Sequence, residues 1–264
     1  KVIYFYWLIK YIISNVFELV NELKQTHSIQ IKFINIGGGL GIPYKPNTSP
    51  IDLDKFVCNL KEYWDLSVSR YSIDWNINLY TECGRYITGP YGYLVSSIKS
   101  IKKTSSSQIF YGLDSCMANL MRPGMYNSYH YISVPRLTNE TEQIKANVVG
   151  TLCENNDWFC HDRDLPIGIE KEDLIVIHDT GAHSFSMGFN YNSKLKSPEL
   201  LKLDGDISLI RFRETIYDLF SNCIVNDAKI NKKNDNSDAL LLLTIILFVM
   251  FCFAIIWTTV FLFF

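Results

Sequence analysis

Apolar and polar positions in the first third of the chain follow helical and strand spacing in turn. Between residues 11 and 24, apolar side chains recur at helical spacing: Ile12, Val16, Leu19, Val20 and Leu23. Such spacing predicts one amphipathic helix. The next run, IQIKFINI, predicts a strand that leads into three consecutive glycines, and a second helix is expected over residues 53–66. A short strand, NLYTE, then ends at Glu82, so the order of elements predicts a parallel α/β sheet or barrel.

The pattern changes after Gly89 and Pro90, where short β-rich runs replace the helices. Turn residues separate these runs: YGYLVSSIKSI, SQIFYGL, YHYISV, IKANVVGTL, DLIVIHD and GDISLIRF. Their spacing is typical of an all-β unit. The predicted fold class is therefore α/β plus β, with an α/β part over residues 1–90 and a β-rich domain over residues 91–220. A polar linker is expected over residues 221–238.

Both ends of the chain are unusual. Residues 239–264 carry no charge, and a helix of that length would span about 39 Å, more than the roughly 30 Å of a bilayer core. Two explanations of this uncharged segment stay open. It is a transmembrane tail that leaves the body of the protein in the cytosol, or it is the translation of T-rich non-coding sequence. At the start, Lys10 interrupts the apolar run and no small-residue cleavage site follows. We interpret this start as the interior of a domain rather than a targeting segment.

Charge and cysteine content narrow the function classes. The net charge is −2 with an isoelectric point near 6.2, and no basic stripe alternates with aromatic residues, so nucleic acid is not an expected partner. The seven cysteines form no CxxC pair and no cysteine–histidine set with zinc spacing, so no metal site is expected. An odd number of scattered thiols fits a reducing compartment and a cytoplasmic location.

The glycine run GGGLG, Gly37 to Gly41, is the first candidate for chemistry. It follows a predicted strand directly, and Gly37, Gly38 and Gly39 leave backbone N–H groups free to surround an anion such as phosphate. Pro43 follows and no helix opens at once, which excludes the dinucleotide-binding motif, and a Walker A ending is absent. A purely structural turn is the alternative.

A second anion-suited turn follows the next predicted strand. In TECGRYITG, the residues Glu82, Cys83, Gly84 and Arg85 stand at the strand end, and the guanidinium of Arg85 suits phosphate or carboxylate. Consecutive parallel strands end at one edge of a sheet, and barrel phosphate sites form there. The alternative for this turn alone is a surface ion pair.

Five segments in order carry a resemblance to a known family: INIGGGLGIPY, TECGRYITGPYG, GLDSCMANLMRPGMYNSYHYI, VVGTLCENNDWFCHDRDLP and IHDTGAHSFSMGFNYNSKLKSPELL. They resemble the C-terminal part of diaminopimelate decarboxylases, pyridoxal-phosphate enzymes with an alanine-racemase-like barrel. The resemblance implies the last strands of a (β/α)8 barrel followed by a C-terminal β-barrel or sandwich. It also implies decarboxylation of meso-2,6-diaminopimelate to L-lysine and CO2, the last step of lysine biosynthesis.

The resemblance implies roles for individual residues. Pyridoxal 5′-phosphate would be held by Gly37, Gly38, Gly39, Glu82, Cys83, Gly84, Arg85 and His183. The amino-acid substrate would be bound by Arg85, Arg122, Tyr126, Glu154 and His183, with Cys153 as the proton donor. A thiol suits that step near neutral pH. A homodimer with shared active sites is implied as well.

The pair Arg122 and Glu154 bears on the substrate. The far end of diaminopimelate is itself an amino acid, so it needs a cation and an anion, whereas lysine or ornithine presents only an ammonium group there. The alternative is a structural salt bridge. Related decarboxylases of ornithine, arginine or carboxynorspermidine, and a non-catalytic membrane-tethered binding protein, stay open as other functions.

The chain departs from the family pattern in three places. His183 stands where tyrosine is common, with Tyr191 as a substitute ligand, and Cys83 stands where proline is common. No lysine lies in a context that matches the family's cofactor-binding lysine. We therefore expect that this chain alone neither binds the cofactor covalently nor decarboxylates a substrate.

Overall fold

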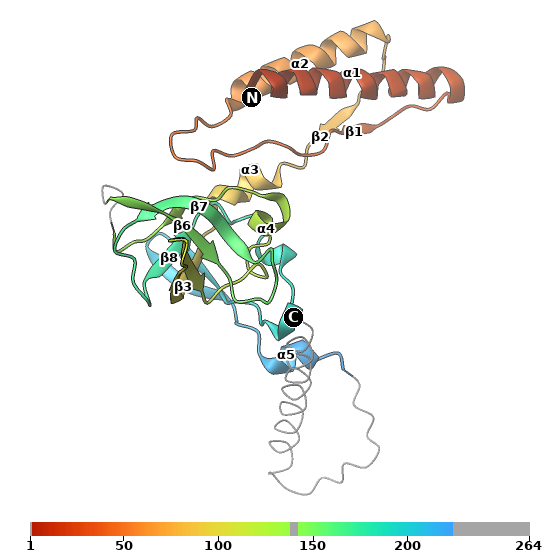
Figure 1. Cartoon of the computed structure of the whole chain (residues 1–264). Helices are drawn as coiled ribbons and strands as arrows, with labels where there is room; N and C mark the ends of the chain where they lie inside the picture. Colours follow the sequence, from red (N-terminus) through yellow and green to blue (C-terminus); the bar gives the residue numbers. More distant parts are fainter. Residues whose placement is uncertain (1, 138–141, 224–264) are drawn as a thin grey trace, which may run out of the picture. The chain divides into compact units, whose positions relative to one another are not determined.

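The computed structural model describes residues 2–137 and 142–223 (Figure 1). By contacts the chain divides into a unit of residues 1–219 and a unit of residues 220–264. Within the described ranges, none of the helices has the length and apolar character needed to cross a membrane. The predicted transmembrane tail, residues 239–264, lies outside the described residues, as does the predicted linker from residue 224 onward.

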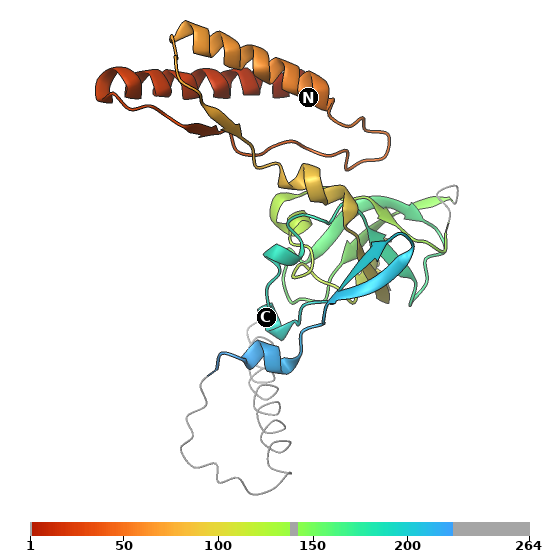
Figure 2. The ribbon, with the colours of Figure 1, turned by 180° about the vertical axis from the view of Figure 1, so that it is seen from behind.

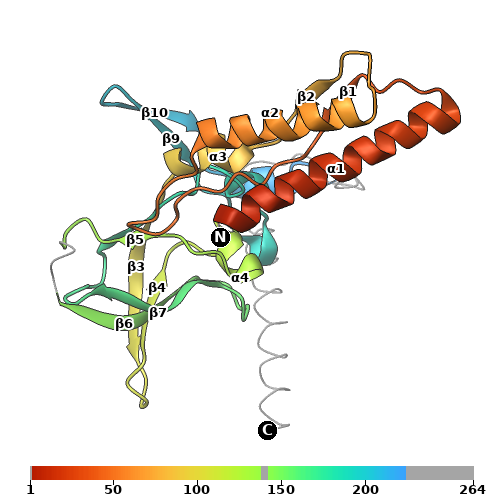
Figure 3. The ribbon, with the colours of Figure 1, turned by 90° about the horizontal axis from the view of Figure 1, so that it is seen from above.

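Two long helices and a short parallel strand pair form the first part of the chain. Helices α1 (Val2–His27) and α2 (Leu53–Arg70) lie side by side in Figure 3, and strands β1 (Phe33–Asn35) and β2 (Asn78–Tyr80) pair in parallel. The helix and strand predictions here are confirmed in type. The predicted strand IQIKFINI is shorter than expected, because β2 offers only three residues to pair with.

Apolar side chains from α1, α2 and the strands share one core. Ile13 and Phe17 are fully buried, and the Phe17 ring meets the edge of Trp64 at 4.9 Å between centroids. Asp52 caps α2 by accepting a hydrogen bond from the Lys55 backbone N–H at 2.9 Å.

The buried residues of α1 are Ile9, Ile13, Phe17 and Val20. Of the five positions that the sequence predicted for the apolar face only Val20 is buried, and Leu19 is 54% exposed, so the buried face is offset from the predicted one.

Helices α3 (Gly84–Thr88) and η1 (Gly89–Tyr91) lead into the second, β-rich part, whose core is a six-stranded sheet. Its strands are β3 (Leu94–Lys103), β4 (Ile109–Leu113), β5 (Ile132–Ser133), β6 (Gln143–Val149), β7 (Trp158–Pro166) and β8 (Leu174–Ile177). The spatial order is β5-β8-β3-β4-β6-β7, antiparallel throughout except for the β4–β6 pair. This sheet encloses a separate hydrophobic core of residues between 98 and 177.

The remaining elements surround or follow the sheet. They are α4 (Arg122–Tyr126), η2 (Phe185–Met187), η3 (Tyr191–Ser193), β9 (Glu199–Leu203), β10 (Asp206–Arg211) and α5 (Ile216–Phe220). Strands β9 and β10 form their own antiparallel hairpin, visible in light blue in Figure 2. The predicted all-β texture is confirmed, but β7 and β9 were not expected from the sequence. The boundary near residue 90 stays a prediction.

Truncating Phe17 tests the α1–α2 core. Phe17→Ala is expected to lower the free energy of unfolding by about 3–5 kcal/mol, because it removes a fully buried ring. Phe33→Ala is the matched control: Phe33 is 60% exposed and its ring meets Tyr80 in an edge-to-face pair, so a loss below about 1.5 kcal/mol is expected. Urea unfolding measures both values, and equal losses would contradict this account of the core.

Candidate functional site

The two predicted anion turns lie against each other. Because β1 and β2 are parallel, the turns that follow them start at the same edge, and the Glu82 backbone N–H donates to the Gly37 carbonyl at 2.8 Å. Asn35 Nδ2 donates to Glu82 Oε1 at 2.7 Å. A Cβ on Gly38 would collide with the Glu82 carbonyl oxygen. The neighbouring turn therefore explains why a side chain is missing at Gly38.

The glycine turn also has the features of an anion cradle. Gly37 and Gly39 have φ of +72° and +112°, and a Cβ at either position would meet open space. In the part of the chain that the structure describes, the N–H groups of Gly38 and Gly39 have no hydrogen-bond acceptor. The half-buried Arg85 likewise has no carboxylate partner within these residues. Free donors and an unpaired cation fit a bound phosphate.

A small pocket of about 120 Å³ adjoins this turn. It is lined by Ile9, Ile12, Ile13, Ile36, Gly37, Gly38, Gly39, Leu40, Phe56, Thr81 and Cys83. Helix α1 thus supplies an apolar wall next to the glycine amides, and none of the lining residues is a lysine.

Arg122, the first residue of α4, is buried with only 7% of its surface exposed. Its Nη1 donates to the Tyr44 hydroxyl at 2.6 Å and lies 3.5 Å from His130 Nε2, and its Nη2 donates to Ser128 Oγ at 3.3 Å. No carboxylate among the described residues pairs with it. A structural salt bridge is therefore not what holds Arg122 in this chain.

His130 is fully buried behind Arg122, and its tautomer follows from its partners. Its Nδ1 lies 2.8 Å from the His178 backbone carbonyl, which can only accept, so Nδ1 carries the proton and Nε2 presents a lone pair to Arg122. Burial, together with the charges of Arg122 and Arg163, lowers the pKa of His130 to about 4. The imidazole is thus neutral at physiological pH and tolerates the guanidinium beside it.

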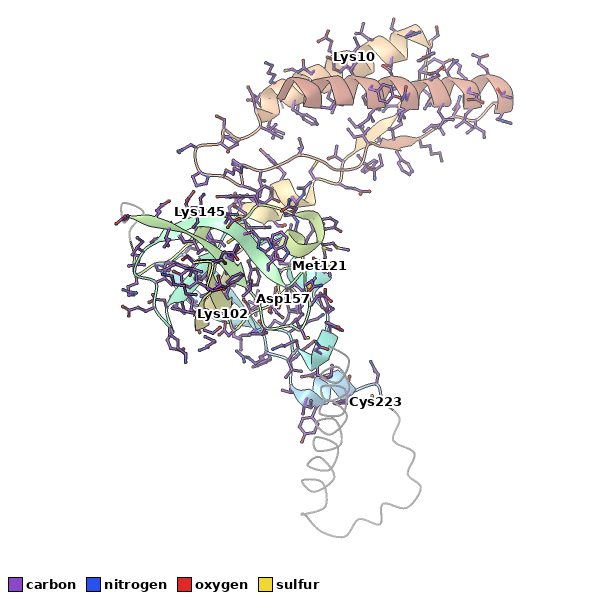
Figure 4. The ribbon with its side chains drawn as sticks, viewed as in Figure 1. Lys10, Lys102, Met121, Lys145, Asp157 and Cys223 are labelled. Carbon is purple, nitrogen blue, oxygen red and sulfur yellow. The ribbon has the colours of Figure 1, made fainter. Side chains whose placement is uncertain are left out.

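Cys153 and Glu154 are exposed on the loop between β6 and β7. Asp157, which is labelled in the β-rich part in Figure 4, holds this loop from its buried end. Its carboxylate accepts from the backbone N–H groups of Met117 at 2.5 Å and Leu152 at 2.6 Å. Burial raises the pKa of Asp157, while these hydrogen bonds oppose the rise. The loop's path is therefore fixed by one buried carboxylate.

The structure brings some predicted residues together and leaves others apart. The glycine turn and the turn of Glu82, Cys83, Gly84 and Arg85 are adjacent. Glu154 forms no ion pair with Arg122 among the described residues. Tyr126 is 58% exposed, Tyr191 is exposed, and His183 is exposed with φ of +60°.

Three residues of this region were not expected from the sequence: Tyr44, His130 and Asp157. Tyr44 is the last residue of the segment INIGGGLGIPY, and Asp157 stands four residues after Cys153. Both therefore lie in segments that carry the family resemblance. His130 also lies within such a segment, GLDSCMANLMRPGMYNSYHYI, but nothing in the sequence distinguished it from its neighbours there.

Comparison with known proteins identifies the family of this chain. The family model described as pyridoxal-dependent decarboxylase, C-terminal sheet domain, matches residues 11–181, more than half of the chain. The chain belongs to this family. The expected fold class, the end of an α/β barrel followed by a β domain, is thereby confirmed.

Individual relatives show which proteins of this family the chain is similar to. Protein TabA of Pseudomonas amygdali pv. tabaci is 42% identical over 77% of this chain and 47% of its own length. The diaminopimelate decarboxylase of Methanothermobacter thermautotrophicus is 35% identical over 78% of this chain and 47% of its own length. The crystal structure of M. jannaschii diaminopimelate decarboxylase with L-lysine superposes with a TM-score of 0.71 and 32% sequence identity. The superposition covers 83% of the present chain and 49% of the M. jannaschii chain. The chain spans about half the length of the relatives it matches.

The buried imidazole predicts a pH-dependent stability. Between pH 6.5 and 4 the unfolded chain takes up a proton at residue 130 before the folded chain does, so the free energy of unfolding falls as the pH falls. The contribution of His130 is fully present above pH 6.5, and roughly 3 kcal/mol of it is lost on acidification through pH 4.

Denaturant unfolding between pH 7 and 4 measures this dependence. His130→Asn is expected to flatten it, whereas His27→Asn, at the exposed end of α1, leaves it as in the unmodified chain. An unchanged slope in the His130 variant would refute the neutral, buried imidazole.

Proposed function

We propose that this chain is the C-terminal portion of a pyridoxal-phosphate-dependent diaminopimelate decarboxylase, which converts meso-2,6-diaminopimelate to L-lysine and CO2. The observation that carries the proposal is the buried guanidinium of Arg122, which has no carboxylate partner within the described ranges. A buried charge needs compensation, so an anionic ligand is the expected counterpart. The relatives named diaminopimelate decarboxylase support the choice of substrate.

The cofactor phosphate fits the two adjacent turns. The N–H groups of Gly38 and Gly39 and the guanidinium of Arg85 would hold the phosphate, with Gly37, Glu82, Cys83 and Gly84 shaping the turn around it. When bound, pyridoxal phosphate supplies an electron sink for the carbanion that forms as CO2 leaves. The protein's part is to orient that group and to exclude water around it.

Arg122 has donors to spare for a substrate carboxylate. A guanidinium has five N–H donors. The hydrogen bonds of Arg122 to Tyr44, His130 and Ser128 use three of them. Nε–H and one Nη2–H are left without an acceptor in the described parts of the chain, and two donors match the two oxygens of a carboxylate. Arg122 would bind the distal carboxylate of diaminopimelate and Glu154 its ammonium group.

Cys153 would return the proton that replaces CO2 on the α-carbon. Its thiol is exposed on the loop that Asp157 holds, and Glu154 follows it directly. Because Glu154 makes no ion pair with the Arg122 of its own chain, we propose a homodimer in which this loop serves the site of the partner. Tyr126 and His183 are proposed as further substrate contacts, Arg85 as a second carboxylate ligand, and His183 as a cofactor contact in a cytoplasmic enzyme.

A substrate panel tests the proposal. The protein expressed from its own transcript is expected to release CO2 from meso-diaminopimelate at least about 100-fold faster than from ornithine, arginine or carboxynorspermidine.

Cys153→Ala is expected to lower turnover by about 100-fold or more while cofactor affinity is unchanged, since only proton transfer is lost. Cys58→Ala, an exposed thiol on α2, is the control. Preference for ornithine, or equal loss of turnover and cofactor binding in the Cys153 variant, would count against it.

The chain of 264 residues by itself is expected not to hold the cofactor covalently, because no lysine lines the pocket at the glycine turn. The measurement is borohydride reduction after incubation with pyridoxal phosphate, followed by mass spectrometry of the peptides. A single lysine modified in high yield would contradict this expectation.

A further inference from the structure

We propose that Tyr44 is a positioning residue that fixes the guanidinium of Arg122 and couples it to the glycine turn. The inference rests on the proposed function for the role of Arg122 as a carboxylate ligand. Tyr44 lies on the loop between β1 and α2, outside the β-rich part that carries Arg122. Its contact with Arg122 therefore joins the two parts of the proposed site.

Two contacts join the guanidinium of Arg122 and the phenol of Tyr44, and a third places His130 against the same ring. The Tyr44 hydroxyl accepts from Arg122 Nη1 at 2.6 Å, and the guanidinium carbon lies 5.3 Å from the centroid of the Tyr44 ring. The same ring meets the His130 imidazole nearly at right angles, at 5.3 Å between centroids. The remaining contact of Nη1, with His130 Nε2, is 3.5 Å and close to the limit for a hydrogen bond. The phenol hydroxyl is thus the main acceptor for Nη1.

The segment from Gly37 to Tyr44 is tied at both ends. At one end the Gly37 carbonyl accepts from the Glu82 N–H at 2.8 Å, and at the other Tyr44 holds Arg122. The Tyr44 N–H also donates to the Ile42 carbonyl at 3.0 Å, which tightens the turn between these ends. An anion that orders the glycine amides therefore restricts Tyr44, and by linkage an anion on Arg122 strengthens binding at the turn.

Tyr44→Phe removes the hydroxyl and keeps the ring. It therefore tests the hydrogen bond to Arg122 apart from the aromatic contacts with Arg122 and His130. Tyr129→Phe is the matched control: the Tyr129 ring has Arg163 at 3.8 Å and Lys45 at 5.2 Å from its centroid, and the hydrogen bonds of Arg122 in the described chain go to Tyr44, His130 and Ser128 instead. The probe is nitrogen-detected NMR of the arginine side chains in the full chain, with the Arg122 signal assigned from its loss in Arg122→Lys.

Two readouts follow from the same samples. Hydrogen exchange of the Arg122 guanidinium is expected to be at least about tenfold faster in Tyr44→Phe than in the unmodified chain or Tyr129→Phe, since a hydrogen bond to a charged group is lost. Titration with inorganic phosphate is expected to shift the Gly38 and Gly39 amides and the Arg122 signal together. In Tyr44→Phe the glycine amides still shift and the Arg122 signal does not.

The outcomes separate this inference from the proposed function. Unchanged exchange in Tyr44→Phe, or an equal change in Tyr129→Phe, overturns the positioning role. An Arg122 signal that still follows phosphate in Tyr44→Phe overturns the coupling. If phosphate moves neither the glycine amides nor Arg122 while exchange depends on the hydroxyl, the phosphate site of the proposed function fails and the positioning role stands.

In the expressed enzyme, Tyr44→Phe is expected to raise the KM for meso-diaminopimelate about tenfold with little change in kcat, because it weakens the placement of a binding group rather than a reacting one. A fall in kcat at constant KM would contradict that assignment.

Discussion

The rest of the site depends on the burial of a guanidinium that no carboxylate of the described chain neutralises. An arginine side chain keeps its charge in proteins, so Arg122 has to be stabilised by neutral acceptors and by whatever anion binds. The acceptors come from separate segments: Tyr44 from the loop after the glycine turn, and Ser128 and His130 from the segment after α4. The charge therefore requires these segments to pack together, and it adds to the effect of burial, which keeps His130 neutral.

A second constraint acts at the strand ends. The parallel pairing of β1 and β2 brings two turns so close that the Glu82 carbonyl occupies the space of a side chain at Gly38. Gly38 is thus needed for the approach of one turn to the other, whereas Gly37 and Gly39 are needed for their positive φ angles. Close packing of the two turns and exposure of the N–H groups both favour anion binding. A turn that lacks side chains and is held by its neighbour presents its amides in a fixed arrangement.

The loop that carries Cys153 is held in place by one buried polar residue, Asp157. Asp157 satisfies two backbone N–H groups in a buried position, one on its own loop and one at Met117. Burying a carboxylate is costly unless it is hydrogen-bonded, so both bonds have to form when the loop folds. Cys153 and Glu154 can stay exposed because the hydrogen bonds of the buried Asp157 carboxylate order their loop.

Local patterns in the sequence determined the two helices, the glycine turn after a strand and the change to β structure near residue 90. Each of these depends on the spacing or conformational freedom of neighbouring residues, and the family likeness rests on the same short segments. Strand limits were less predictable: IQIKFINI pairs over only three residues, and β7, with its polar residues His161 to Asp164, does not alternate clearly. Only the tertiary structure decided that Arg122 has no carboxylate partner among the described residues, that His130 contacts it and that Tyr44 reaches it. These facts depend on which distant segments meet, and no local pattern encodes the distance between a hydroxyl at residue 44 and a guanidinium at residue 122.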